Sequence, residues 1–274
     1  MARNSTFEVA TDTSQFTAMQ LQPKTLLSLT WNGYARWLRE HLISFPNLIK
    51  DHGFGTAVLG ISIEYLEPLS FFDSDTLSVT VSLKVRREAS RIQVSTDFFG
   101  AGKHAAQASL LLCPLEIGDP ETLAAAPTRV PESLLVRFSA DEIDPTSPER
   151  QVPNMVREIN DSGNLLTEGE GGFTIHHHLC EVAEQWSFIE VPNIVESVRE
   201  PLALDIHEKI PAMRQCLSQP LRRFNVELNR PYFVFESGQV KTQAHLLQGR
   251  LAFVHQLFSA EGTDEVYGTI VEEY

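Results

Sequence analysis

Apolar residues recur at spacings of three and four between Trp31 and Lys50, which is the period of one buried helical face. The residues on this face are Trp31, Tyr34, Leu38, Leu42 and Phe45. Pro46 stands near the end of the pattern, where proline breaks or bends a helix, and glycines follow at positions 53 and 55. The pattern predicts one long helix over residues 31–50.

After this helix the period changes to two. Apolar and polar residues alternate over 61–65, 77–84 and 91–98, and residues 105–112 have the composition of a further strand. Alternation of this kind is typical of an antiparallel sheet that is covered on one face. One helix followed by several long strands predicts a helix wrapped by a curved sheet.

Three segments recur in order along the chain. Residues 16–17, 34–42 and 63–73 match residues 173–174, 194–202 and 226–236, at offsets of 157, 160 and 163. A duplicated unit is expected to mimic a symmetric dimer, here with the two sheets joined edge to edge. The expected domains are 1–115 and 173–274, joined by a proline-rich connector over 116–172 that has one short helix near Leu134 to Phe138.

Two motifs carry a resemblance to a known family. The predicted helix has an aromatic-x-Arg-Trp pattern with an acidic end, and the next strand leads into Tyr-Leu-x-Pro and Phe-x-Asp elements; these are Tyr34, Arg36, Trp37 and Glu40, then Tyr65-Leu66-Glu67-Pro68 and Phe71-Phe72-Asp73. In motif order and spacing the chain resembles the hot-dog thioesterase superfamily, most closely the 4-hydroxybenzoyl-CoA thioesterase type. The resemblance covers about residues 16–113 and 173–274.

The resemblance implies an α+β double hot-dog fold, in which two long helices are each wrapped by an antiparallel sheet and the sheets join as a pseudo-dimer. It also implies an acyl-CoA or acyl-carrier-protein thioester as substrate, with no cofactor and no metal. The chain departs from the family at the Asp-x-Asp-x-x-Gly-His stretch before the helix, which aligns near residues 22–28. Gln22, Lys24 and Ser28 replace the acidic and histidine positions, so the usual catalytic carboxylate is missing there.

Thioester hydrolysis needs a group that polarises the carbonyl and a group that activates water. We expect the helix to begin around Thr30 to Gly33, where free N–H groups could bind the carbonyl and glycine permits close approach. An ordinary helix start capped by Thr30 or Asn32 explains the same residues. The candidate substrate-binding residues are Asn32, Gly33, Tyr34 and Trp37.

Glu40 and Ser44 are the candidate catalytic residues. They continue a stripe from Gly33 and Trp37 along one face of the helix, which we expect to face the partner domain. The pair of a glutamate and a hydroxyl residue at i and i+4 also resembles the arrangement in a branch of the superfamily that acts on aryl-CoA substrates. Alternatively Glu40 is a solvated or salt-bridged helix carboxylate. The second copy offers His178 and Glu181 as further candidates. The histidines at 176–178 could also bind a metal if they lie on a strand, although the spacing identifies no third ligand.

The net charge of −14 argues against a nucleic-acid partner. An acidic partner would need a local basic patch. The candidates, which solvated strand ends explain equally, are Arg86, Arg87, Arg91, Arg222 and Arg223.

The three cysteines form no disulfide framework, and Cys180 is either a buried small residue or a nucleophile. The absence of a long apolar run predicts a cytoplasmic protein without a membrane span, and a homodimer of pseudo-dimers is one expected assembly.

The expected function is acyl-CoA or acyl-carrier-protein thioesterase. Two alternatives stay open. The first is acyl transfer with decarboxylation, as in double hot-dog proteins of natural-product pathways that lack the usual carboxylate. The second is a non-catalytic module that binds acyl thioesters.

Overall fold

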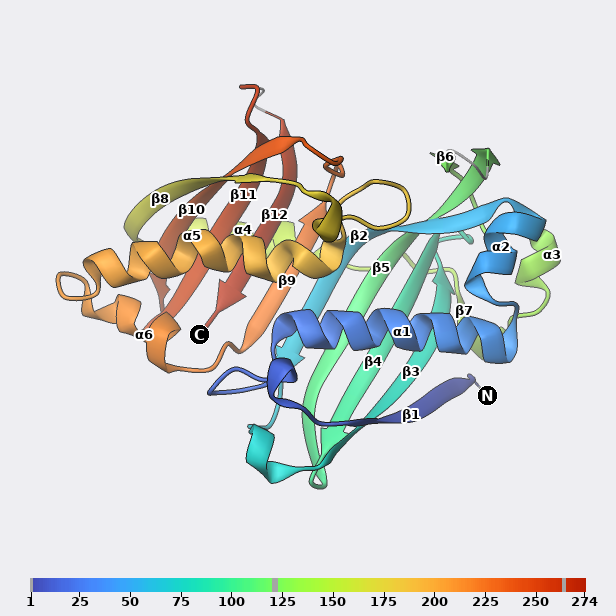
Figure 1. Cartoon of the computed structure of the whole chain (residues 1–274), viewed down its shortest axis with the longest axis horizontal. Coiled ribbons are helices and arrows are strands. Elements are labelled where there is room, and N and C mark those ends of the chain that lie inside the picture. The colour runs from blue at the N-terminus through green and yellow to red at the C-terminus, as the bar shows by residue number, and fades with distance from the viewer. Residues whose placement is uncertain (1, 120–122, 263–264) are drawn as a thin grey trace. The chain divides into compact units, whose positions relative to one another are not determined.

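The computed structural model describes residues 2–119, 123–262 and 265–274. The chain divides into two compact units, Met1–Glu149 and Arg150–Tyr274, here called unit 1 and unit 2. Each unit contains one antiparallel sheet with a long helix on it (Figure 1).

Unit 1 has five main strands in the order β1-β3-β4-β5-β2, and all neighbouring pairs are antiparallel. Its elements are β1 (Asn4–Ala10), α1 (Pro23–His41), α2 (Phe45–His52), β2 (Phe54–Tyr65), β3 (Thr76–Arg86), β4 (Arg91–Gly100), β5 (Lys103–Asp119), β6 (Ala124–Pro127), α3 (Glu132–Leu135) and β7 (Ile143–Asp144). Short 3₁₀ turns span Thr13–Gln15, Phe71–Asp73 and Ala140–Glu142.

The core of unit 1 lies between α1 and the sheet. Leu77, Val79, Val81 and Leu83 alternate along β3 and are all buried, as the period of two predicts. The predicted strands over 61–65, 77–84, 91–98 and 105–112 are therefore confirmed.

The predicted single helix over 31–50 is wrong at both ends. Helix α1 begins at Pro23, and a second helix begins at Phe45 with Pro46 in its first turn, where proline is well tolerated. The apolar period continues across the break because Phe45 packs against Trp31 and Tyr34, at ring-centroid distances of 5.8 and 5.9 Å. Gly53 ends α2 with a φ of 56°, a left-handed cap that favours glycine.

Unit 2 repeats the order of unit 1, with strands β8-β10-β11-β12-β9. Its elements are α4 (Gln151–Ser162), β8 (Asn164–Thr174), α5 (Val191–Ile206), α6 (Arg214–Ser218), β9 (Arg223–Leu228), β10 (Ser237–Leu247), β11 (Arg250–Ser259) and β12 (Val266–Glu273), with 3₁₀ turns at His177–Leu179, Phe188–Glu190 and Pro211–Met213. The identical strand order confirms the predicted duplication. The edge-to-edge joining of the two sheets stays a prediction.

The third repeated segment forms the same turn in both units. The N–H groups of Leu66 and Glu67 both donate to the carbonyl of Ala105, and those of Asn229 and Arg230 both donate to the carbonyl of Tyr267. A carboxylate then closes the next turn, because the N–H of Ser70 donates to Asp73 and that of Phe233 donates to Glu236, both at 2.9 Å. The repeated acidic position thus has a local structural role.

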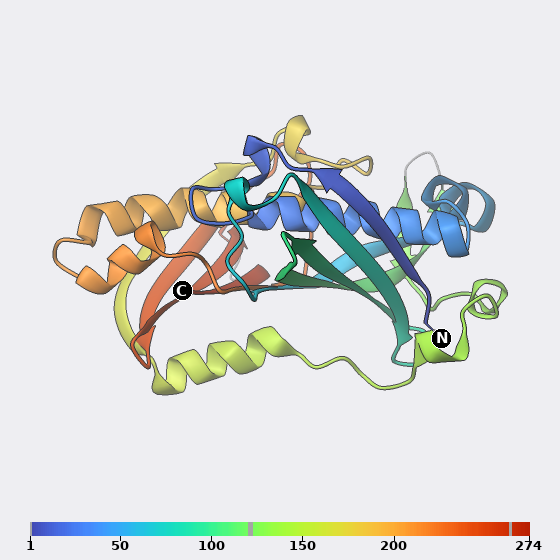
Figure 2. The same ribbon diagram turned by 90° about the horizontal axis from the view of Figure 1, so that it is seen from below.

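The segment expected to be a connector, 116–172, contains regular structure. Strand β6 and helix α3 belong to unit 1, and α3 lies at the expected short helix, whereas α4 and β8 belong to unit 2. Helix α4 packs on the opposite face of its sheet from α5 (Figure 2), against Ala252, Val254 and Val271. Within the described residues no helix combines the length and apolarity needed to cross a membrane.

Candidate functional site

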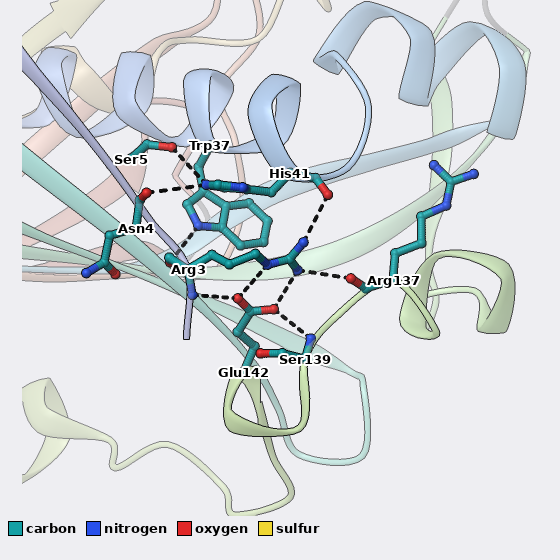
Figure 3. A network of polar contacts seen from close by, with 8 residues as sticks. All are labelled: Arg3, Asn4, Ser5, Trp37, His41, Arg137, Ser139 and Glu142. Atoms are coloured by element: carbon teal, nitrogen blue, oxygen red, sulfur yellow. Dashed lines mark hydrogen bonds and ion pairs between the residues drawn. The ribbon is translucent and has the colours of Figure 1, made fainter. Parts of the chain in front are cut away.

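Three polar side chains meet at the C-terminal end of α1 in unit 1. Ser5, which is buried on β1, donates a hydrogen bond from its hydroxyl to Oε2 of Glu40 at 2.5 Å. The Nε2 atom of His41 lies 3.4 Å from the same hydroxyl (Figure 3). Glu40 itself is exposed. A hydroxyl, a solvent-accessible carboxylate and an imidazole therefore lie within one hydrogen-bonding group, a combination suited to proton transfer.

An ion pair next to this group connects β1 with a distant segment. Arg3 donates from Nε to Oε1 of Glu142 at 2.8 Å and from Nη2 to Oε2 at 2.6 Å. The N–H groups of Arg3 and Ser139 add hydrogen bonds of 2.8 Å each to the same carboxylate (Figure 3). Burial raises the pKa of Glu142, but the bonds from Arg3 and Ser139 outweigh it and lower that pKa to about 2.

Arg3 also holds the end of α1. Its Nη1 donates to the carbonyl of His41 at 3.1 Å, one of the carbonyls that a helix end leaves without an intrahelical partner. Its Nη2 donates to the carbonyl of Arg137 at 3.0 Å. The guanidinium stands 5.1 Å from the Trp37 ring centre, and Trp37 donates from Nε1 to the carbonyl of Arg3 at 2.9 Å. One arginine thus connects strand β1, helix α1 and residues 137–142.

The segment from Val130 to Glu142, here called the strap, covers an apolar cavity beneath α1. The cavity measures about 10 Å³, room for about one water-sized sphere. Its lining is Tyr34, Leu38, Leu42, Leu48, Phe54, Leu83, Ile92, Val130, Leu134 and Phe138. Phe138 also stacks on Trp37 at 5.8 Å, so the strap forms a wall of the cavity next to the polar group.

Of the four predicted substrate-binding residues, only Tyr34 lines this cavity. Burial raises the pKa of the Tyr34 hydroxyl, and its interaction with the Thr56 side chain opposes that shift only in part. Gly33 instead packs on strand β3, and Trp37 packs on Phe138 of the strap. A Cβ at Gly33 would lie 2.3 Å from Cγ2 of Val81, so this glycine allows close packing of helix on strand. Asn32 is exposed and accepts a hydrogen bond from Arg36.

The predicted start of the helix at Thr30 to Gly33 is wrong, because these residues lie inside α1. The stretch aligned with the family loop, 22–28, also lies at and within the first turns of α1, with Gln22 as its N-cap. Ser44 stands outside α1, as the N-cap residue of α2, so the expected i, i+4 pair of Glu40 and Ser44 on one helix does not exist. The hydroxyl beside Glu40 comes from Ser5, on a strand 35 residues earlier.

The predicted residues of the second copy lie on a loop before α5. His178 belongs to a 3₁₀ turn, not to a strand, and both it and Glu181 are exposed. His176 and His178 stack at 6.0 Å. In the part of the chain that the structure describes, no group of three or more His, Cys, Asp or Glu could hold a metal ion. Cys180 is partly exposed, and burial of its thiol raises its pKa, which disfavours the reactive thiolate.

Sequence reasoning missed a buried charged network in unit 2. Arg199 on α5 donates from Nη1 to both oxygens of Glu272 on β12, at 2.6 and 2.7 Å. Nε2 of His255 lies 3.2 Å from Oε2 of Glu272, and Nδ1 lies 2.9 Å from the Thr242 hydroxyl. A charged carboxylate can only accept, so Nε2 of His255 donates its hydrogen to Glu272.

The electrostatics of this network favour a charged Glu272. Burial raises its pKa, but the Arg199 charge and the hydrogen bonds from His255 and Arg199 lower it to about 2. The side chains of Arg199, His255 and Glu272 are at most 4% exposed, so the network is closed to a substrate in this structure.

The strand positions of unit 1 that correspond to Thr242, His255 and Glu272 carry no charge. The strand registers pair Val81 with Thr96 and Val94 with Leu110, where unit 2 pairs Thr242 with His255 and Phe253 with Glu272. Unit 2 therefore places charged groups among buried apolar side chains at strand positions that are uncharged in unit 1.

Comparison with known proteins identifies the fold. No protein-family model and no curated protein matches the sequence. Solved structures match almost the whole chain, among them a protein assigned as an oleoyl thioesterase from Lactobacillus plantarum (TM-score 0.74, 9% identity, 99% of this chain and 96% of that chain). A 12:0-ACP thioesterase from Umbellularia californica matches at a TM-score of 0.69, with 10% identity over 98% of this chain and 93% of its own.

This chain has the double hot-dog fold. An acyl-ACP thioesterase from Bacteroides thetaiotaomicron is also similar to it, with a TM-score of 0.65, 11% identity and coverage of 98% of this chain and 96% of that chain. The double hot-dog prediction from the sequence motifs is thus confirmed, although identities near one in ten leave each site residue to be argued from this chain alone.

Proposed function

We propose that this chain is a thioesterase that hydrolyses an acyl-CoA or acyl-carrier-protein thioester. The observation that carries the proposal is the apolar cavity beneath α1, which is adjacent through Phe138 and Trp37 to the group of Ser5, Glu40 and His41. The three similar structures support the same substrate class, since they are named for acyl thioester hydrolysis. A cytoplasmic location belongs to the proposal.

In the proposed reaction the acyl group enters between α1 and the strap. Glu40 accepts a proton from a water molecule, and the water oxygen attacks the thioester carbonyl carbon. The C–S bond then breaks, and the thiolate leaves and takes up a proton. Ser5 holds the Glu40 carboxylate in place through its hydrogen bond of 2.5 Å.

The test is turnover of a panel of acyl-CoAs and acyl-carrier proteins, with free thiol and acyl transfer to a second thiol measured separately. Glu40→Gln keeps the shape of the side chain and removes the charge, and it should lower turnover by roughly 100-fold or more with the fold intact. Glu8→Gln is the matched control, because Glu8 is an exposed carboxylate on the same strand as Ser5.

Three results would separate the alternatives. Thiol release that depends on Glu40 supports hydrolysis. Transfer without net release indicates an acyltransferase. Binding without either reaction, or turnover unchanged by Glu40→Gln, contradicts the proposed role of Glu40.

A further inference from the structure

We propose that the strap determines the length of acyl chain that this protein accepts, with Leu134 and Phe138 as the specificity-determining side chains and Arg3–Glu142 as the anchor that holds them. This inference rests on the proposed function. It concerns the wall of the cavity, whereas the proposed hydrolysis concerns Glu40.

The size of the cavity is the first observation. Its 10 Å³ hold about one water-sized sphere, far less than an alkyl chain of several carbons requires. Leu134 and Phe138 are both buried and both line it, so their side chains occupy the space beneath α1. With the strap in this position no alkyl chain fits against Leu38 and Leu42, so entry of an acyl chain requires Leu134 and Phe138 to move.

The attachment of the strap is the second observation. Near its start, the N–H of Val130 donates to the carbonyl of Ala89 at 2.8 Å. At its end, the buried Glu142 carboxylate accepts three hydrogen bonds from Arg3 and one from Ser139. This donor set outweighs the opposing effect of burial and keeps Glu142 charged at neutral pH, so the ion pair that anchors the strap is formed there.

Leu134 can be changed without touching the polar group, whereas Phe138 stacks on Trp37 beside it. Leu134→Ala and Phe138→Leu enlarge the cavity, and the preferred acyl chain should become longer. Each further methylene that is accommodated should tighten binding by about fourfold. Leu134→Phe should have the opposite effect. Val136→Ala is the matched control, because Val136 lies in the same strap but is 73% exposed.

The anchor predicts a second effect. Glu142→Gln weakens the attachment without changing a cavity-lining residue, so it should broaden the range of accepted chain lengths. A merely destabilising change would lower affinity for all lengths alike. Broadening at equal affinity for the shortest chain is therefore the signature of a positioning role for Arg3–Glu142.

The closing experiment measures the dissociation constants of a straight-chain series, from butyryl to palmitoyl, of acyl-CoA thioether analogues that cannot be hydrolysed. Calorimetry on the full chain and its variants gives these values. A shift of the optimum to longer chains in Leu134→Ala and Phe138→Leu, to shorter chains in Leu134→Phe, and none in Val136→Ala is the expected result. An unchanged length profile in all variants, or no binding of any analogue, overturns the inference. Length-dependent binding without turnover of the natural thioesters would overturn the proposed hydrolysis and leave the strap supported.

Discussion

Replacing Glu272 by glutamine tests whether the buried network of unit 2 is structural. Burial alone would raise the pKa of Glu272, yet its partners lower it to about 2 from the ordinary 4.5. At about 1.4 kcal/mol for each pKa unit, this depression stabilises the folded state by about 3 kcal/mol. Glu272→Gln also removes the closest partner of the buried Arg199, which keeps only Glu196 and Glu200 at 3.5 Å, so we expect a cost near the lower end of the about 3–5 kcal/mol typical of a broken buried pair.

The pH dependence follows from the sign of the shift. A depressed carboxyl pKa contributes stability that is complete above the unfolded value near 4.5 and is lost as the pH falls towards 2. The wild-type unit 2 should therefore weaken between pH 5 and about pH 2, whereas the variant should be weaker at neutral pH and change less over that range.

Hydrogen exchange of the β11 and β12 amides, read by mass spectrometry at several pH values, follows unit 2 separately from unit 1. Glu273→Gln is the matched control, because Glu273 neighbours Glu272 on β12 and forms a partly exposed pair with Arg223 at 3.6 Å. The control should change stability by less than about 1 kcal/mol. A cost of Glu272→Gln no larger than that of the control, or an unchanged acid dependence, would refute the account of the network.

Three further changes are predicted in unit 1. Gly33→Ala should lower the free energy of unfolding by about 1–2 kcal/mol despite the better helix propensity of alanine, because the new Cβ meets Val81; a urea titration that finds stabilisation would contradict this. Trp37→Phe should cost about 1–2 kcal/mol, since the Arg3 carbonyl loses its donor, and an unchanged melting temperature would show that this bond is dispensable. Ser5→Ala should lower kcat less than Glu40→Gln does, and a larger fall would instead indicate that Ser5 itself reacts with the acyl group.

The sequence predicted those elements in which one face packs on a single layer of the structure, because their hydrophobic periodicity follows directly from that packing. The alternation along residues 77–84 marks a strand covered on one face, and the three repeated segments predicted the duplication. The helix ends were predicted badly, because Phe45 continues the helical period of Trp31 and Tyr34 through a tertiary contact between two helices. A periodic pattern alone cannot distinguish one long helix from two helices that pack against each other.

The candidate site was predicted only in part. Glu40 and Tyr34 were identified from a motif, but Ser5, which bonds Glu40, lies 35 residues earlier, and Glu142 pairs with Arg3 across 139 residues. Neither residue carries a local signal, since serine and glutamate are ordinarily surface residues. The network of Arg199, His255 and Glu272 was also missed. Its residues lie at buried positions, where the hydrophobic pattern favours apolar side chains.

The most direct test of the central claim is a crystal structure of the full chain with a short-chain 2-oxoalkyl thioether of CoA, in which a methylene between sulfur and carbonyl prevents hydrolysis and the carbonyl is kept. The account predicts that the acyl group lies between α1 and the strap, in contact with Leu38, Leu42 and Leu134, with the carbonyl directed towards Glu40. An acyl group bound elsewhere in the chain, with the cavity beneath α1 unchanged, would contradict it.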